Sequence, residues 1–357
     1  MPRELMEPAN DAEKLLLECA QKGEPAYVAN FDDKTVRAEF LRDICVRAGD
    51  YELHEKGVQL LGADIDGALD FEAATLLRPL WLFECVLKAG LMLRDAETRS
   101  LGFPSCIIAG ISGDRLRVKG TLSLSDAAVS GETRPLGADI EGDLVCSNAG
   151  FCNLDSEKAF SADGIRIGGS LFMRDTTAVG ETRLLGADIG ANVNCLDALL
   201  LNPEGDAFTA DRIRVGGSVF LANVSAIGET WLVGACIEGN LDCAGATFDN
   251  PGGNAFCAQR LAVGGRFFLT AVKNFAGSLD LMHARVGDFN DDGSAWPVKG
   301  GLWIDGFTYE NLMPDRDTAV DRITWLRLMQ QNLGGDPRHF PQPYEQLIKV
   351  GAEVGNG

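Results

Sequence analysis

The sequence has little of what most catalytic and metal sites use. It contains only three histidines, at positions 54, 283 and 339, and no two of its cysteines stand in a CxxC pair. A zinc site needs ligands that converge from neighbouring loops, and this pattern is absent. No Ser/His/Asp or Cys/His arrangement can be proposed from the spacing. We therefore expect no catalytic residue, no metal and no cofactor, and predict that the chain is not an enzyme.

Long apolar runs are missing as well. No stretch reaches the roughly 18 residues that a membrane helix needs, and residues 1–7 lack the basic-then-apolar layout of a signal peptide. Three of the cysteines, Cys146, Cys195 and Cys243, instead recur at one slot of a repeat, inside alternating apolar runs. We interpret them as small buried side chains in a reducing cytoplasm, and we expect no membrane insertion.

What the chain does have is a repeat of about 48 residues through its middle. Three motifs keep this step. One begins at Asp114, Asp163 and Asp211, with a fainter copy at Gln259. Gly-Glu-Thr begins at Gly131, Gly180 and Gly228, and Gly-Ala-Asp/Cys-Ile begins at Gly137, Gly186 and Gly234, with an earlier copy at Gly62. A strict period of this length makes each unit pack on its neighbours.

Within the repeat the apolar period is 2. In residues 232–248, Ala235, Ile237, Leu241 and Cys243 fall on one side of a strand, and polar residues fall on the other. Each repeat then makes two coils, and some ten or eleven coils stacked about 4.8 Å apart would give a rod of roughly 50 Å. We predict a mainly β protein, a right-handed parallel β-helix. Residues 77–113 have strand character, but the sequence does not give their register.

Helical segments are expected at both ends, and they define three parts: an N-terminal cap over 1–55, the β-helix over 56–310, and a C-terminal cap over 311–357. In the first part, Asp11 is expected to cap a helix that Gly23 ends, and a second helix is expected to start after Asp32 or Asp33. In the last, residues 317–333 carry Ile323, Leu326, Met329 and Leu333 at helical spacing, and a short helix is expected from Pro343. Caps of this kind cover the open core of the end coils.

The Gly-Ala-x-Ile-x-Gly-x-Leu runs resemble the pentapeptide-repeat superfamily of right-handed quadrilateral β-helices, most clearly at Ala63, Ala138 and Ala187. The chain is more similar to poorly characterised bacterial proteins that share this unit and a tail phrase matched here by residues 342–347. Some of these are labelled membrane-associated oxidoreductases, a label that no motif in this sequence supports. The pentapeptide-repeat resemblance also implies a possible homodimer through the C-terminal helices.

The formal net charge of −20 disfavours direct binding of nucleic acid and anionic lipid, and favours basic partners. Glu132, Glu181 and Glu229 recur as an acidic ladder, and Arg117, Arg166 and Arg214 recur as a parallel basic ladder. We interpret both as a solvated charged face that keeps neighbouring rods from pairing. The paired glycines after Val215 and Val263 are interpreted as corner residues, because no dinucleotide fingerprint surrounds them. His283, beside an apolar run, is expected in the core or at its rim.

Two hypotheses of function follow, with an enzyme carrying an unrecognised site as a third. The first is a non-catalytic cytoplasmic scaffold that binds an unknown protein partner, with Trp231 and Trp325 as exposed contacts. The second is an acidic mimic of DNA that acts on gyrase, a topoisomerase or another DNA-binding protein, as the resemblance implies for some pentapeptide-repeat rods. Its candidate residues are outward acids of the coils: Asp64, Asp66, Asp139, Glu141, Asp143, Asp188, Glu238 and Asp242. The net charge of the repeat body falls short of the roughly 30 charges on 50 Å of duplex.

Overall fold

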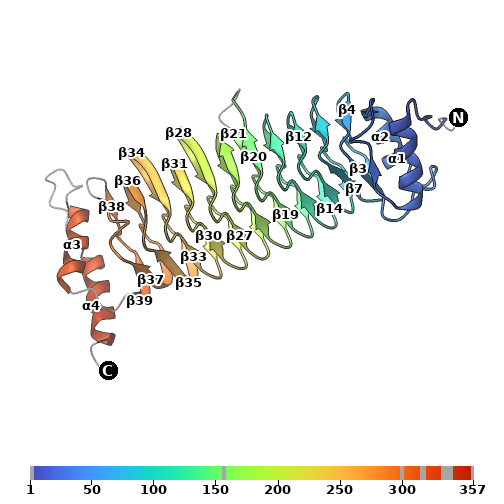
Figure 1. Ribbon diagram of the computed structural model, residues 1–357. Helices are drawn as coiled ribbons and strands as arrows, with labels where there is room; N and C mark the ends of the chain where they lie inside the picture. Colours follow the sequence, from blue (N-terminus) through green and yellow to red (C-terminus); the bar gives the residue numbers. More distant parts are fainter. Residues whose placement is uncertain (1–3, 155–157, 298–300, 314–318, 331–340, 355–357) are drawn as a thin grey trace. The chain divides into compact units, whose positions relative to one another are not determined.

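The structure, a computed structural model, describes residues 4–154, 158–297, 301–313, 319–330 and 341–354. The chain divides into two compact units, unit 1 over Met1–Val179 and unit 2 over Gly180–Gly357. Each unit is a parallel β-solenoid with helices at its terminal end, and the two contain about 11 turns between them (Figure 1). The chain is therefore mainly β and built from repeated coils, as the sequence predicts.

Unit 1 begins with α1 (Asp11–Lys22) and also contains α2 (Ala38–Val46). Its strands line two sheets. Sheet A contains β1 (Ala26–Tyr27), β3 (Val58–Leu61), β6 (Thr75–Leu76), β7 (Leu80–Phe83), β10 (Glu97–Thr98), β11 (Leu101–Gly102), β14 (Arg117–Val118), β15 (Leu122–Ser123), β18 (Asp139–Ile140), β19 (Leu144–Val145), β22 (Arg166–Ile167) and β23 (Leu171–Phe172). Sheet B contains β2 (Thr35–Arg37), β4 (Asp64–Asp66), β5 (Leu69–Asp70), β8 (Val86–Leu87), β9 (Leu91–Met92), β12 (Ile107–Ile108), β13 (Ile111–Ser112), β16 (Ala128–Val129), β17 (Thr133–Arg134), β20 (Gly150–Cys152), β21 (Lys158–Ser161) and β24 (Thr177–Val179).

Unit 2 repeats this layout and ends in α3 (Ala319–Gln330) and α4 (Gln342–Val354). Its sheet A strands are β26 (Asp188–Ile189), β27 (Val193–Asn194), β29 (Arg214–Val215), β30 (Val219–Phe220), β32 (Cys236–Ile237), β33 (Leu241–Asp242), β35 (Ala262–Leu269), β37 (Arg285–Asp291) and β39 (Thr308–Met313). Its sheet B strands are β25 (Glu181–Arg183), β28 (Leu199–Thr209), β31 (Ser225–Trp231), β34 (Thr247–Cys257), β36 (Asn274–Asp280) and β38 (Leu302–Trp303).

The repeat predicted from the sequence is confirmed as two coils, and the two differ in length. Asp188 pairs with Arg214, and Arg214 in turn pairs with Cys236 after a shorter stretch of chain. The longer coils carry a protruding loop on sheet B, where the register of β28 and β34 shifts. Asn202 and Asn250 close these loops by donating from Nδ2 to the carbonyls of Asp206 and Asn254, at 2.9 and 3.1 Å. The repeat is therefore set by a loop in every second coil.

Residues 77–113, whose register the sequence leaves open, follow the same parallel pairing. Glu97 pairs with Thr75 on one side and with Arg117 on the other, and Ile107 pairs with Val86 and with Ala128. This region is thus a regular part of the array. Its coils are all short and carry no protruding loop. The alternation of longer and shorter coils that marks the repeat is therefore missing from this part of the sequence.

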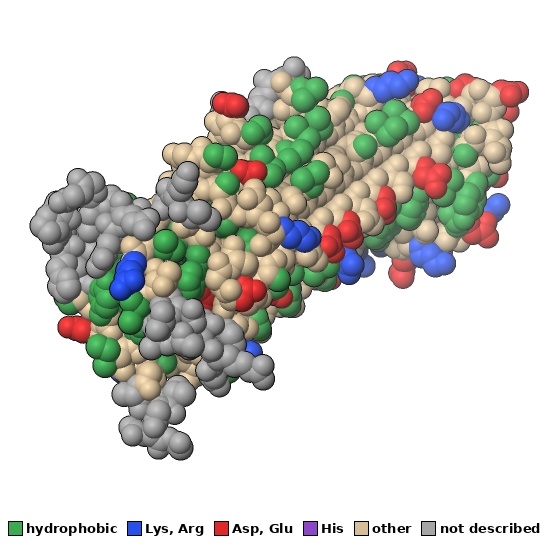
Figure 2. Space-filling view, turned by 60° about the vertical axis from the view of Figure 1, so that its left-hand side comes forward, with side chains coloured by type: hydrophobic (Ala, Val, Ile, Leu, Met, Phe, Trp, Pro, Cys, Tyr) green, Lys and Arg blue, Asp and Glu red, His purple; other side chains and the backbone are tan. Residues whose placement is uncertain are grey.

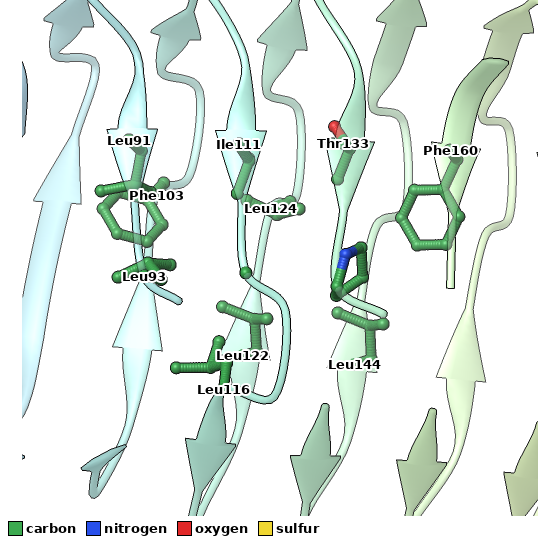
Figure 3. A pocket seen from close by; sticks show the side chains of 12 residues that line it. Leu91, Leu93, Phe103, Ile111, Leu116, Leu122, Leu124, Thr133, Leu144 and Phe160 are labelled. Carbon is green, nitrogen blue, oxygen red and sulfur yellow. The ribbon is translucent and has the colours of Figure 1, made fainter. Parts of the chain in front are cut away.

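The core forms from the inward side chains of successive coils. Ile189 and Ile237, the residues on which the predicted register depends, are each 1% exposed, and the three recurring cysteines are buried as predicted. Burial raises the pKa of the Cys195 thiol to about 12, so it stays protonated at neutral pH. In unit 1, a ring of apolar residues surrounds an interior cavity of only about 10 Å³, too small to hold more than a single water (Figure 3).

Aromatic rings thicken the core of unit 2. Phe256, Phe267, Phe289 and Phe307 succeed one another with ring centroids 6.1, 5.6 and 5.2 Å apart. Rings at this separation gain attraction beyond the area they bury. The last ring also lies 5.4 Å from Tyr309, so the stack runs to the final strand of sheet A.

The paired glycines lie where the coil bends, as predicted. Gly216 is in the bend between β29 and β30, and its φ is not positive. A Cβ there would collide with the carbonyl oxygen of Gly190 in the preceding coil, so glycine is required by the close stacking of backbones. The left-handed corners are elsewhere, for example at Gly234 with φ +66°. His283 occupies such a corner, with φ +59°, and is exposed rather than in the core.

The N-terminal part contains both predicted helices, and strands between them. Asn10, not Asp11, caps α1, accepting from the Glu13 amide at 2.9 Å, and Gly23 ends it as predicted. The second helix begins later than predicted, at Ala38, because Thr35–Arg37 form β2 and pair with β4. Likewise β1 pairs with β3. The solenoid therefore begins within the predicted N-terminal cap rather than after it.

At the other end, α3 and α4 lie where helices were predicted. Within α3, Leu326 and Met329 are buried as predicted, but Ile323 is 40% exposed, and Arg322 is buried in its place. Leu333 and residue 317 lie outside the described residues. The side chain of Gln342 in α4 accepts from the Gly306 amide and donates to the Phe307 carbonyl, at 2.9 and 3.1 Å. Gln346 donates to the Tyr309 carbonyl at 2.7 Å. Two glutamines thus occupy the open edge of the last coil.

Among the helices that the structure describes, none combines the length and apolar character that crossing a bilayer requires.

Candidate interaction surface

The outward face of sheet A in unit 1 alternates in charge from coil to coil. Glu97, Arg117, Asp139 and Arg166 are consecutive partners along one column. Arg117 donates to Glu97 at 2.8 Å. Unit 2 has the same alternation where Asp188 pairs with Arg214. The predicted basic ladder is therefore interleaved with acids of the Gly-Ala-Asp-Ile coils, and at neighbouring strands about 4.8 Å apart the opposite charges compensate each other.

The eight acids proposed for DNA mimicry do not share one face. None of them is buried. Asp64 and Asp66 lie on β4 of sheet B, where Asp64 is 3.4 Å from the Lys34 ammonium. The other six lie on or beside strands of sheet A: Asp139, Glu141, Asp143, Asp188, Glu238 and Asp242. The early Gly62 copy of the motif turns the opposite corner of its coil, which moves its aspartates to the other sheet.

Figure 2 gives the same picture of charge on the face it displays, where red and blue side chains are interspersed with green ones and form no continuous acidic band. DNA presents an unbroken line of phosphates along each strand. Interspersed charges of both signs do not reproduce such a line. This distribution argues against mimicry of a duplex.

The predicted glutamate ladder lies on sheet B and is not a solvated face. Glu181 is only 6% exposed and accepts from the Thr209 hydroxyl at 2.8 Å. Glu132 accepts from the Ser161 hydroxyl at 2.7 Å. These two carboxylates accept hydrogen bonds between neighbouring coils, because Ser161 and Thr209 each belong to the coil that follows.

The two tryptophans expected at the surface are less accessible than predicted. Trp231 is half-buried in the outward column of sheet B, and its Nε1 donates to Asp206 of a protruding loop at 2.9 Å. The prediction that Trp325 is an exposed contact is wrong. Its side chain is 2% exposed, and its ring centroid lies 6.2 Å from that of Phe289. The α3 helix turns it toward the core, so its aromatic character serves packing rather than recognition.

A groove of about 580 Å³ opens on sheet A of unit 1, at the bend between the two strands of each coil. Its basic residues are Arg78, which is half-buried, and Arg99 and Lys119, which are exposed. Leu77, also in the lining, is 57% exposed. The floor lacks a side chain at Gly120, where a Cβ would collide with the preceding coil. We call this feature, lined by Leu77, Arg78, Arg99, Lys119 and Gly120, the basic groove.

An aromatic surface adjoins the basic groove. A second hollow of about 370 Å³ is lined by Lys56, Gln59, Pro79, Trp81 and Phe83, of which Pro79 directly follows Arg78 in the chain. The Trp81 and Phe83 rings stack with centroids 6.0 Å apart. Trp81 lies over Gly102 of the next coil, since a Cβ at that glycine would collide with its ring. Trp81 therefore packs on the backbone of Gly102 and is half-buried, with part of its area open.

The cations of the basic groove differ from two arginines close to them, Arg115 and Arg117. Arg115 is paired with Asp95 at 2.6 Å, and its hydrogen bonds hold the pKa of Asp95 below its usual value. Arg117 is paired with Glu97 at 2.8 Å. Within the described part of the chain, no ion pair involves Arg78, Arg99 or Lys119. The one acid in the lining, Glu97, is already paired with Arg117. The groove therefore holds three positive charges without an ion pair among the described residues, on a chain whose net charge is −20.

Sequence reasoning missed the basic groove because its cations do not recur in the repeat. The column position of Arg99 and Lys119 is occupied by Glu141 one coil further on. Arg78 and Trp81 come from the segment whose register the sequence leaves open. A signal was present in the cluster of cations and aromatics between residues 78 and 99, but only the coil register brings residue 119 beside them.

The described residues contain no other arrangement with an obvious chemistry. No group of three or more His, Cys, Asp or Glu side chains is placed to hold a metal ion among them. All ten cysteines are free thiols. The features left for recognition are outward columns of side chains and the basic groove.

No family model, no curated protein and no solved structure matches this chain. The resemblance to pentapeptide-repeat proteins therefore remains a prediction from sequence motifs. What the fold itself shows is coarser: the chain is a repeat protein that winds as a parallel β-solenoid.

Proposed function

We propose that this protein is a non-catalytic scaffold that binds another protein through sheet A of unit 1. The observation that carries the proposal is the junction of the basic groove with the Trp81–Phe83 surface. Tryptophan and arginine are the residues most enriched at the energetic centres of protein interfaces. Here Trp81 packs on Gly102, and Leu77 of the basic groove is 57% exposed.

The rigidity of the surface supports binding as its role. The strands β7 and β11, which carry Trp81 and Gly102, are each held on both sides by parallel neighbours, so little ordering entropy is lost when a partner docks there. A cytoplasmic location is part of the proposal, in keeping with ten free cysteines. Self-association through the C-terminal helices stays a further proposal, for which the 70% exposed Ile348 of α4 is the natural contact.

DNA mimicry is the weaker proposal. The acids that would carry it lie on two sheets and alternate with arginines, so no single face approaches the charge density of a duplex. Inhibition of gyrase supercoiling by micromolar protein would reverse this ranking.

The proposal is tested by affinity capture with four forms of the full chain: the native protein, Trp81→Ala, Arg99→Glu and the control Lys88→Glu. Lys88 is exposed in the same coil as Arg78 but follows β8 of sheet B. We expect a partner that the native protein and Lys88→Glu retain and that the other two variants lose. Identical recovery by all four forms would remove this face from consideration. Circular dichroism of each variant checks that the solenoid is intact.

A further inference from the structure

We infer that the occupant of the basic groove is a short, extended acidic segment of the partner protein, held through its carboxylates. This rests on the proposed function and names the chemistry of the partner. The inference comes from the charge of the groove rather than from its aromatic neighbours. Three cations that lack an ion pair within the described residues converge on an open hollow, and their natural complement is a set of carboxylates.

Two arginines near the groove show what a paired cation looks like here. Each meets a carboxylate from the coil before it: Arg115 meets Asp95, and Arg117 meets Glu97, which also lines the groove. Arg99 and Lys119 also lie in one column across neighbouring coils, because Thr98 and Val118, the residues directly before them, are paired. Yet the residue one coil earlier in the column is Leu77, which offers no charge. A partner carboxylate would supply what the coil lacks.

The spacing of the cations fits a polypeptide. Neighbouring strands lie about 4.8 Å apart, so three coils extend about 10 Å, a length covered by about three residues of extended chain. Arginine presents a planar fork of donors that binds a carboxylate through two parallel hydrogen bonds. Arg78 and Arg99 can each take one carboxylate this way, and the Lys119 ammonium can take a third. The segment would then run along the stack of coils.

A nucleic acid fits less well than an acidic peptide. Glu141 follows Lys119 in the same column and is exposed, and Asp139 lies beside it, so phosphates that continued along the face would meet two carboxylates. Nucleic-acid sites usually neutralise about six to ten phosphates, many more charges than this groove provides. The stacked face of Trp81 is covered by Gly102, which also reduces its use as a platform for bases.

The experiment measures fluorescence anisotropy of a labelled hexaglutamate peptide titrated with the full chain at low ionic strength. We expect saturable binding that weakens as salt is raised, because the contacts are exposed charges. Arg99→Glu and Lys119→Glu should each weaken binding about tenfold, the change that a loss of one such contact produces. Lys88→Glu, on the other sheet, should bind the peptide as the native protein does. Thermal melting of each variant should match that of the native protein.

The controls are labelled hexalysine and a labelled oligothymidylate of matched charge. Binding of hexaglutamate that none of the charge reversals changes would overturn the inference, as would binding of the oligonucleotide in preference to the peptide. If hexaglutamate does not bind although Trp81→Ala loses a captured partner, the acidic segment is wrong and the proposed function stands. If no partner is lost by any variant either, both are wrong.

Discussion

The two ends of the molecule are anchored by the same chemistry in two different environments. At the N-terminal end, Glu13 of α1 is completely buried and accepts from the amides of Ala9 and Arg37 and from the Arg37 guanidinium. At the C-terminal end, Asp291 of β37 is 1% exposed and lies 2.6 Å from Arg322 of α3. The Glu13–Arg37 pair joins α1 to β2, and the Asp291–Arg322 pair joins β37 to α3.

The arginines differ in their access to water. The Arg37 side chain is 30% exposed, whereas that of Arg322 is 3% exposed and lies 5.9 and 5.8 Å from the Trp296 and Trp325 ring centroids. Asp291 also accepts from Trp296 Nε1 at 2.7 Å. A buried charge that loses its partner has no water to replace it, while a half-exposed one has. The same arginine–carboxylate pair is therefore expected to contribute more to stability at the C-terminal end than at the N-terminal end.

The largest effect is expected for Arg322→Ala. It leaves the Asp291 carboxylate buried without its cation and should destabilise the docking of α3 by about 3–5 kcal/mol. Amide hydrogen exchange within α3 measures this loss directly, and the shifted fluorescence of Trp296 and Trp325 supports it. The double variant Arg322→Met with Asp291→Leu, which removes both charges, should recover most of the stability. If the single variant exchanges as slowly as the native protein, the buried pair does not anchor the cap.

Glu13→Gln at the other end should cost less, about 1–3 kcal/mol, since the amide can still accept one hydrogen bond and Arg37 can turn to water. The pH dependence sharpens the comparison. Burial raises the pKa of Glu13, but hydrogen bonds from Arg37 and from the Ala9 amide outweigh it and leave the pKa below its ordinary value of 4.5. This carboxylate therefore stabilises the fold above pH 4.5, and its contribution is lost as pH falls through the lowered value.

Thermal melting between about pH 3 and 7 checks this sign. The native protein should lose stability below pH 4.5 more steeply than Glu13→Gln does, and the two curves should approach each other at the acid end. Curves that stay parallel across this range would mean that Glu13 does not titrate with folding.

The smallest effect is expected for Arg37→Lys. Lysine keeps the charge but cannot hold Glu13 through two nitrogens, as Arg37 does with Nε and Nη2 at 2.9 and 2.7 Å. We expect a loss below about 1 kcal/mol, because the position is partly solvated. The matching change Arg322→Lys should cost more, and equal urea midpoints for the two variants would remove the distinction between the ends.

Both anchors show where sequence reasoning stops. Helical periodicity placed α3 correctly, yet it assigned Ile323 to the buried face, and Arg322 is buried instead. Periodicity assigns burial from the polarity of each side chain, so it does not predict that Arg322 is buried against the Asp291 carboxylate of the last coils. Likewise the Gly62 and Gly137 copies of one motif are indistinguishable in sequence, but they turn opposite corners and send their aspartates to different sheets.

The candidate site was the least accessible to prediction. The outward direction of the eight acids follows from alternation, and none of them is buried. Their alternation with arginine follows only from the coil register, which pairs Asp139 with Arg117 and Arg166. The basic groove depends on that register too, since its residues come from three coils, of which only the one with Lys119 carries a motif of the repeat.

The sequence alone determined that the backbone coils, which side chains face inward, and that two coils make one repeat. Strand alternation and glycine spacing are local properties, and a strict period leaves each unit no neighbour but a copy of itself. Only the tertiary structure decided which charges lie side by side and which remain without a partner. Neighbours across coils are separated in the chain by a whole coil, and coils differ in length, so a fixed spacing in the sequence does not identify the partner of a residue.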